Sequence, residues 1–159
     1  MGEGIAVASA RYWDDLAEGE RLNCRPFSLG QAEIMEFAGT YDPQLFHIDE
    51  EIAAASRFKG IIASSLHTLS SCTRVIVEAL EGVQIMIGLG ILAVELPNAV
   101  RPDDILVMDA YWTDLRRSSS KPGQGLATVR FTLRNQRGEA VMESGFKYML
   151  VCRTNMTTP

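Results

Sequence analysis

Asp42 and His47 are the residues of this chain whose types and spacing best suit chemistry. They stand five positions apart, on either side of Pro43, among the aromatic and apolar neighbours of residues 37–49. A carboxylate and an imidazole held close together can serve as a general acid and a general base. The chain has only two histidines, and His67 lies on a different segment. The sequence therefore allows an acid–base site here and excludes a metal site with several histidine ligands.

Each of these residues also has a purely structural interpretation. An aspartate before proline commonly forms an Asx turn, and His47 could be a core histidine bonded to the backbone. Asp49 is expected only to cap a helix. His67 could either line a pocket or pack as a structural residue.

The composition limits the classes of function that remain. A length of 159 residues suits one domain, and 47% hydrophobic with 22% charged residues is typical of a globular protein. A net charge of −5 argues against nucleic acid as the main partner, because phosphate binding needs a basic face. No apolar stretch approaches the roughly 20 residues that a membrane span needs, and the N-terminus does not resemble a signal peptide. We therefore expect a cytoplasmic protein without a membrane partner.

The number and spacing of the cysteines are also what we expect of a cytoplasmic protein. Cys24, Cys72 and Cys152 are far apart, odd in number and set in apolar surroundings. A disulfide framework or a metal site would show pairs at short spacing. We expect three reduced and buried thiols.

A helix of about three turns is predicted directly before the acid–base pair. Ser28 precedes Gln31 at capping-box spacing, and the helix should stop before Pro43, because a residue preceding proline avoids the helical region. Asp42 and His47 are then expected on the loop that leaves the helix. The apolar positions that support this helix are Ile34, Phe37, Ala38 and Tyr41.

The remaining pattern predicts helices first and strands afterwards. Residues 21–27 suggest a short first strand, and residues 50–57 suggest a short helix. Small and apolar residues surround a predicted helix over 65–80 on nearly every side, which indicates a buried helix. Four strands with a glycine hairpin turn at 135–138 follow it, at residues 84–96, 105–118, 125–134 and 139–153. This order favours an α+β fold in which an antiparallel sheet curls around one central helix.

Several motifs, taken in order, resemble the MaoC-like dehydratases, a group that includes the (R)-specific enoyl-CoA hydratases. The run Tyr-Asp-Pro-Gln-Leu-Phe-His-Ile-Asp at 41–49 matches the group's aspartate, four residues, then histidine. The run Phe-Lys-Gly-Ile-Ile-Ala-Ser-Ser at 58–65 resembles the segment that begins the central helix in this group. The run Arg-Pro-Asp-Asp at 101–104 resembles the group's arginine-proline-glycine-aspartate turn, with Asp103 in place of the glycine. The resemblance covers residues 11–153 as a single domain between flexible ends at 1–10 and 154–159.

The resemblance implies a hot-dog fold and an acyl-CoA hydratase or dehydratase, which interconverts a 2-enoyl-CoA and a 3-hydroxyacyl-CoA. It gives the catalytic roles to Asp42 and His47. It implies a homodimer with the active site at the subunit interface, and it leaves higher oligomers open. No metal or other cofactor is implied, since coenzyme A enters as part of the substrate. The substrate contacts that it implies are Phe58, Ser64, Ser65 and Thr73, with Ser65 in place of the family's usual glycine.

Two alternatives stay open at this point. A hot-dog thioesterase would hydrolyse the same thioesters, although the central helix carries no acidic residue before Glu78. A catalytically silent acyl-CoA-binding or dimerisation domain would be marked by Ser65. The sequence does not reveal the acyl chain length, the physiological direction, or which member of the Asp42–His47 pair is the base.

Overall fold

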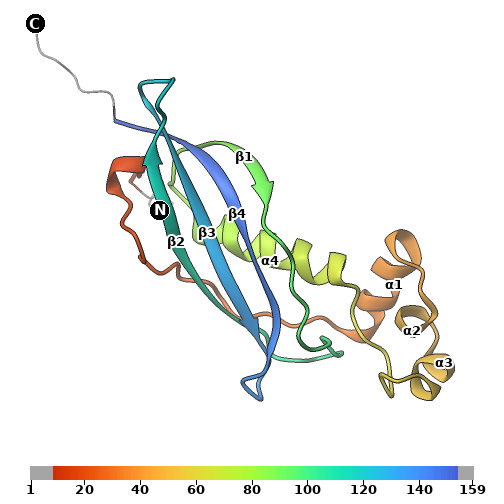
Figure 1. The fold of residues 1–159 in the computed structure, drawn as a ribbon. Helices are drawn as coiled ribbons and strands as arrows, with labels where there is room; N and C mark the ends of the chain where they lie inside the picture. Colours follow the sequence, from red (N-terminus) through yellow and green to blue (C-terminus); the bar gives the residue numbers. More distant parts are fainter. Residues whose placement is uncertain (1–8, 154–159) are drawn as a thin grey trace, which may run out of the picture.

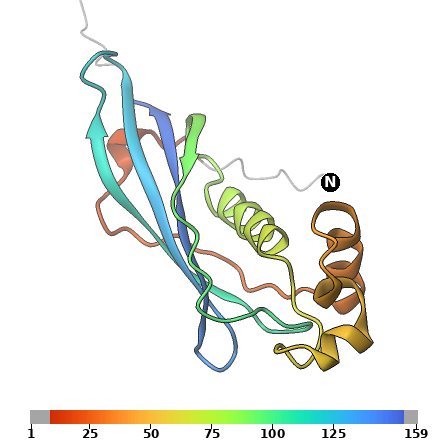
Figure 2. The same ribbon diagram turned by 45° about the vertical axis from the view of Figure 1, so that its right-hand side comes forward.

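A computed structural model describes residues 9–153 and shows one long helix lying along a curved antiparallel sheet (Figure 1). Three shorter helices gather beyond one end of the sheet, beside the start of the long helix (Figures 1 and 2). The predicted α+β hot-dog arrangement is confirmed. The elements are a 3-10 helix η1 (Trp13–Asp15), α1 (Gln31–Tyr41), α2 (Leu45–Ile48), α3 (Glu50–Ala55), α4 (Ser65–Ala79), β1 (Ile85–Ile91), β2 (Val107–Arg117), β3 (Gln124–Arg134) and β4 (Ala140–Val151).

The sheet has the strand order β1-β4-β3-β2, and every neighbouring pair is antiparallel. The sequence explains β3 well, because its buried Val129 and Phe131 alternate with the exposed Arg130 and so give the sheet one apolar face. The hairpin between β3 and β4 turns at Gly138, whose φ of 76° is easy for glycine. The predicted strands and hairpin are therefore confirmed, although β1 is shorter than the expected span of 84–96.

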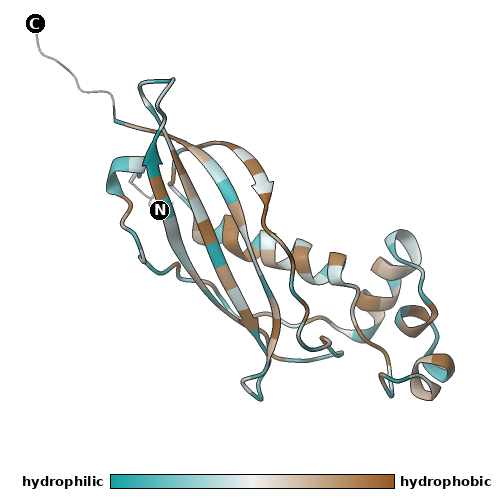
Figure 3. Cartoon of the chain, viewed as in Figure 1, coloured by the Kyte–Doolittle hydropathy of each residue, from teal (hydrophilic) through white to brown (hydrophobic). Residues whose placement is uncertain are grey.

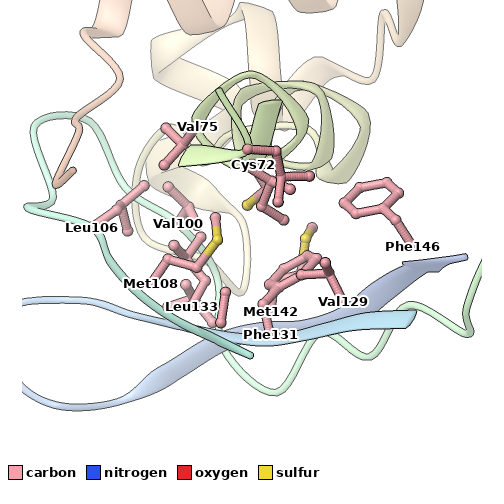
Figure 4. Close-up of a cluster of buried hydrophobic side chains, with 14 of the residues drawn as sticks. Cys72, Val75, Val100, Leu106, Met108, Val129, Phe131, Leu133, Met142 and Phe146 are labelled. Carbon is pink, nitrogen blue, oxygen red and sulfur yellow. The ribbon is translucent and has the colours of Figure 1, made fainter. Parts of the chain in front are cut away.

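The core fills the space between α4 and the apolar face of the sheet (Figure 4). Cys72 and Val75 of α4 face Val129, Phe131 and Met142 of the sheet (Figure 4). Burying a large apolar side chain contributes roughly 1.5–3 kcal/mol, so this layer holds the helix in place. The start of α4 is thereby fixed relative to the sheet.

One prediction about α4 is wrong. The sequence favoured a helix buried on all sides, whereas Leu66 and Val77 of α4 are exposed and only the opposite face packs on the sheet. Hydrophobic residues also run along the outermost strand β1 (Figure 3), where Ile87 and Ile91 are exposed. One sheet cannot surround a helix, so the apolar residues on its far side stay uncovered in a single chain.

The first third of the chain contains three further corrections. Residues 21–27 form no regular strand. Arg21 makes an isolated bridge to Tyr111 of β2, Phe27 makes one to Leu106 just before β2, and Pro26 removes a backbone donor between them. The N-cap of α1 is Gly30, without a side-chain cap, so Ser28 does not cap it. His47 lies on the short helix α2 and not on a loop.

Other expectations are met. Asp49 caps α3, because its side chain accepts a hydrogen bond from the N–H of Ile52. All three cysteines are free thiols, but only Cys72 and Cys152 are buried, while Cys24 is half-buried. Burial raises the pKa of Cys72 to about 12. Asp103, which replaces the family's glycine, has a φ of 62° and so keeps the left-handed turn. No helix within residues 9–153 is long and apolar enough to cross a membrane. The predicted flexible ends fall almost wholly outside the described residues.

Candidate active site

Asp42 sits where α1 ends and the chain turns toward α2. Its backbone N–H donates to the carbonyl of Ala38, and Pro43 follows directly. One carboxylate oxygen, Oδ2, accepts a hydrogen bond from the Ser64 hydroxyl at 2.6 Å, and Oδ1 accepts one from the Gln44 amide at 2.9 Å. First the Ser64 bond and then the Gln44 bond hold the pKa of Asp42 below its ordinary value. The group is therefore a carboxylate at neutral pH.

His47 is held in one orientation by the backbone of the segment that leads into α4. Its ring is buried, with 4% of the residue exposed. Nδ1 lies 2.6 Å from the carbonyl oxygen of Ile62, and because a carbonyl only accepts, Nδ1 carries the proton and donates it. In the neutral ring Nε2 carries the lone pair, and it lies 3.5 Å from Oδ2 of Asp42. The imidazole thus presents a basic nitrogen beside a carboxylate oxygen.

Both groups open into a cavity of about 300 Å³ beside the start of α4. Its wall combines a few polar groups with a larger apolar surface, as in binding sites for small molecules. Within residues 9–153, Asp42 and His47 are the only charged or titratable side chains in this wall. The polar lining residues are Asp42, Gln44, His47, Ser65, Thr68 and Asn98, and the apolar ones are Phe46, Phe58, Ile62, Ala63, Leu96, Ala99, Val100 and Val141.

The N-terminus of α4 lies at the same cavity. Ser64 is its N-cap, and the Ser64 hydroxyl accepts from the N–H of Leu66 at 3.2 Å. The N–H of Thr68 donates to the Ser64 carbonyl. Within the described part of the chain the N–H groups of Ser65 and His67 have no hydrogen-bond acceptor, and Ser65 lines the cavity. A partial positive charge therefore faces the cavity at Ser65.

Most of the residues predicted for the site come together there. Asp42, His47, Phe58 and Ser65 line the cavity, while Ser64 is fully buried behind them. Thr73 does not line the cavity, and its hydroxyl donates back to the carbonyl of Leu69, as a packed residue does.

Sequence reasoning missed three polar lining residues. Thr68 stands three positions after Ser65 on a helix, and that spacing places both on one face, so the signal was present. Gln44 lies between the two catalytic candidates and was available to local reasoning. Asn98 comes from the segment after β1, and no local pattern connects it to the site.

The second histidine has different surroundings. The ring of His67 stacks on Phe37 of α1, with centroids 4.5 Å apart and planes 6° from parallel. Its Nε2 lies 3.6 Å from Oε1 of Glu33, and its buried Nδ1 has no partner among the described residues. His67 does not line the cavity, so its role here is to pack α1 against α4.

Metal chemistry has no support in the described residues. Between residues 9 and 153 no three histidine, cysteine, aspartate or glutamate side chains gather as a candidate metal site. That the protein needs no cofactor stays a prediction.

Known proteins resemble this chain over most of its length. Residues 15–134 match the MaoC like domain. An uncharacterized protein, YdeM of Bacillus subtilis, is 30% identical over 138 residues, which cover 86% of this chain and 96% of that protein. A MaoC-like dehydratase from Rhodospirillum rubrum is 34% identical, with a TM-score of 0.81 over 91% of this chain and 99% of that one. The (R)-hydratase of A. caviae, involved in PHA biosynthesis, shares the fold at 23% identity, with a TM-score of 0.70 over 84% of this chain and 96% of that one.

Proposed function

The chain belongs to the MaoC-like domain family, which supports a hydratase or dehydratase role, and from that premise we propose that it adds water reversibly to a 2-enoyl-CoA. The product of hydration is the 3-hydroxyacyl-CoA, with Asp42 and His47 as the catalytic residues. Coenzyme A enters as part of the substrate, and no metal takes part in the steps proposed here.

One observation carries this proposal: the lone pair on Nε2 of His47 and Oδ2 of Asp42 face one cavity, 3.5 Å apart. Both atoms are acceptors when the carboxylate is ionised and the imidazole is neutral. A water molecule has two hydrogens to donate, one to each of them. Such a water would be oriented and activated for attack on a substrate in the cavity.

The proton transfers follow from this arrangement. In hydration the water oxygen forms a bond to C3, its proton passes to Nε2 of His47, and the C2=C3 electron pair moves onto the thioester oxygen as an enolate. The imidazolium then returns the proton to C2, which restores the thioester and the neutral imidazole. Asp42 stays ionised and stabilises the imidazolium between the two steps. Dehydration runs through the same steps in reverse.

The enolate oxygen needs a donor, and the N–H of Ser65 is suited to that role. It has no acceptor within the described residues, and it lies at the positive end of α4. Losing one donor of this kind typically costs ~3–4 kcal/mol of transition-state stabilisation. Serine keeps the backbone donor that the family's glycine provides, so the replacement at Ser65 is compatible with activity.

A homodimer is the assembly that the exposed apolar surface supports best. β1 is at the edge of the sheet, and one side of its backbone ladder has no partner strand among the described residues. Exposed edges of this kind invite pairing with a second copy. The apolar residues that such pairing would cover are Met86, Ile87, Leu89 and Ile91.

The thioesterase alternative has less support. That chemistry commonly uses a carboxylate on or beside the central helix, and α4 carries none before Glu78. Glu78 is bound to Arg25 and Arg74 near the far end of the helix. Among the carboxylates of the described residues, Asp42 alone lines the cavity.

Hydration of crotonyl-CoA, followed as loss of the enoyl thioester absorbance, tests the proposal. The wild type should consume the substrate without releasing free coenzyme A, and Asp42→Asn should lower kcat by about 10²–10³-fold, because a neutral amide does not stabilise the imidazolium as the carboxylate does. Release of free coenzyme A would favour the thioesterase. Tight binding without turnover of any enoyl-CoA would favour the silent binding domain.

A further inference from the structure

Ser64 has a hydrogen-bond geometry that leaves its hydroxyl no choice of direction. The residue is 0% exposed. A lone pair on its oxygen accepts from the N–H of Leu66 at 3.2 Å, and Oδ2 of Asp42 lies 2.6 Å away on the other side. An ionised carboxylate only accepts, so the single hydroxyl proton of Ser64 must point to Asp42. The Oγ atom of Ser64 is therefore hydrogen-bonded both to the first turn of α4 and to the carboxylate of Asp42.

We propose that Ser64 is a positioning residue, which fixes the reactive oxygen of Asp42 relative to the N-terminus of α4. This proposal rests on the proposed function and deepens it. Asp42 and the Ser65 donor come from segments that α2 and α3 separate along the chain. Ser64 binds one of them and immediately precedes the other, so it sets their relative placement.

The oxygen that Ser64 holds is the one that matters for the proposed reaction. Oδ2 of Asp42 faces Nε2 of His47, and the water would bridge these two atoms. The other oxygen, Oδ1, is held only by Gln44, whose side chain is exposed. Without the Ser64 hydroxyl the carboxylate could rotate, and a shift of about 1 Å in a reacting group can cost on the order of 10²-fold in rate.

The same hydroxyl also affects how the pair titrates. The ion-pair partner of Asp42 within residues 9–153 is His47 of α2, and α4 brings no charged side chain to the cavity, whose other lining residues are uncharged. Removing the Ser64 bond lets Asp42 take up a proton at higher pH. Loss of the ionised carboxylate moves the acid limb of the rate profile to higher pH.

A simple helix cap is the competing explanation, and two substitutions separate it from positioning. Glycine is tolerated at an N-cap, so Ser64→Gly removes the donor to Asp42 while largely sparing the helix. Ser64→Thr keeps both the cap and the donor. Asp49→Ala is the matched control, because Asp49 caps α3 through Ile52 and has no bond to Asp42.

The test measures kcat, KM and the pH dependence of crotonyl-CoA hydration for these variants. Ser64→Gly should lower kcat by roughly 10–100-fold with KM within about twofold, and move the acid limb to higher pH. Ser64→Thr should recover most of kcat, and Asp49→Ala should lower only Tm. A Ser64→Gly enzyme with unchanged kcat and acid limb would reduce Ser64 to a cap.

A second measurement separates failure of this proposal from failure of the proposed function. Carbon NMR of the side-chain carboxyl follows the titration of Asp42 without any substrate. Ser64→Gly should raise the pH at which Asp42 titrates, and Asp49→Ala should leave it unchanged. If neither the wild type nor any variant hydrates crotonyl-CoA, but Asp42 titrates at higher pH in Ser64→Gly, the proposed function is contradicted and the role of Ser64 is not. An Asp42 titration that is identical in Ser64→Gly and wild type would overturn the role of Ser64.

Discussion

Two carboxylate–imidazole pairs lie next to α4, and they differ less in separation than in surroundings. Nε2 of His47 is 3.5 Å from Asp42, and Nε2 of His67 is 3.6 Å from Glu33. His47 has its other nitrogen bound to a backbone carbonyl, whereas the same nitrogen of His67 has no partner among the described residues. The Asp42 side chain is 19% exposed and the Glu33 side chain 60%.

These differences show what turns a contact into a candidate site. A backbone acceptor fixes the tautomer of His47 and so decides which nitrogen is basic. Two side-chain donors hold the Asp42 carboxylate in place, and both groups line one cavity. Glu33 is solvated and free to move, and His67 faces the ring of Phe37. The distance between an acid and a base is thus the least informative part of the comparison.

The largest expected effect comes from making one substitution in both pairs. His47→Gln removes the basic nitrogen, so kcat for crotonyl-CoA hydration should fall by about 10²–10⁴-fold. His67→Gln should change kcat by less than about threefold, because His67 does not line the cavity. Steady-state kinetics of both purified variants measures the difference. An equal loss of kcat in His47→Gln and His67→Gln would contradict the different roles given to the two pairs.

The next effect tests the N–H of Ser65, which lines the same cavity as the first pair. Ser65→Pro removes the N–H of Ser65, yet proline suits the first position of a helix, and Ser64 already has the extended ψ of 141° that a residue before proline prefers. We expect kcat to fall by about 10²–10³-fold with α4 intact by circular dichroism. Ser65→Ala keeps the N–H and should stay close to wild type. A fully active Ser65→Pro enzyme would remove this donor from the mechanism.

A smaller effect concerns the pH dependence of stability. The pKa of Asp42 is lowered in the folded chain, so its ionised form stabilises the fold above the ordinary pKa of aspartate, and this contribution is lost as the pH falls through the folded pKa. Asp42→Asn should therefore lower the free energy of unfolding by about 1–2 kcal/mol at pH 7 and by much less at pH 3. Urea unfolding of the wild type and the variant at pH 7 and at pH 3 measures this difference in the free energy of unfolding.

The second pair provides the comparison for that measurement. Glu33→Gln should change the free energy of unfolding at pH 7 by less than about 0.5 kcal/mol, because exposed ion pairs contribute little. A loss as large as that of Asp42→Asn would show that the two carboxylates are equally well held.

The smallest effect is an expected gain. His67→Phe replaces a buried nitrogen that has no partner in the described chain by an apolar ring, which can still stack on Phe37. The free energy of unfolding should stay level or rise by up to about 1 kcal/mol. His47→Phe should lower it, because the Ile62 carbonyl would lose its donor. Thermal unfolding of both variants compares them, and a destabilised His67→Phe would point to an unseen partner for His67.

Local sequence patterns predicted the parts of the fold that local forces determine. The period of α1, the alternation of β3 and the turn at Gly138 were readable because each depends on neighbours within a few residues. The Asp42–His47 pair was found for the same reason. Residues 21–27 resembled a strand but form only isolated bridges, since Pro26 lies within them.

Long-range contacts account for what the sequence did not reveal. The Ser64 bond to Asp42, the Ile62 carbonyl on His47 and the entry of Asn98 into the cavity all join segments that lie far apart in the chain. Ser64 and Ser65 were both predicted to contact substrate, yet one is a buried donor and the other lines the cavity. Packing of α4 on the sheet decides between them.

Product analysis after reaction of crotonyl-CoA in water enriched with ¹⁸O tests the central claim most directly. The wild type should place the label on C3 of the 3-hydroxyacyl-CoA with the thioester intact, and His47→Gln should form that product far more slowly while His67→Gln forms it at the wild-type rate. Label in a free carboxylic acid, together with released coenzyme A, would contradict the account.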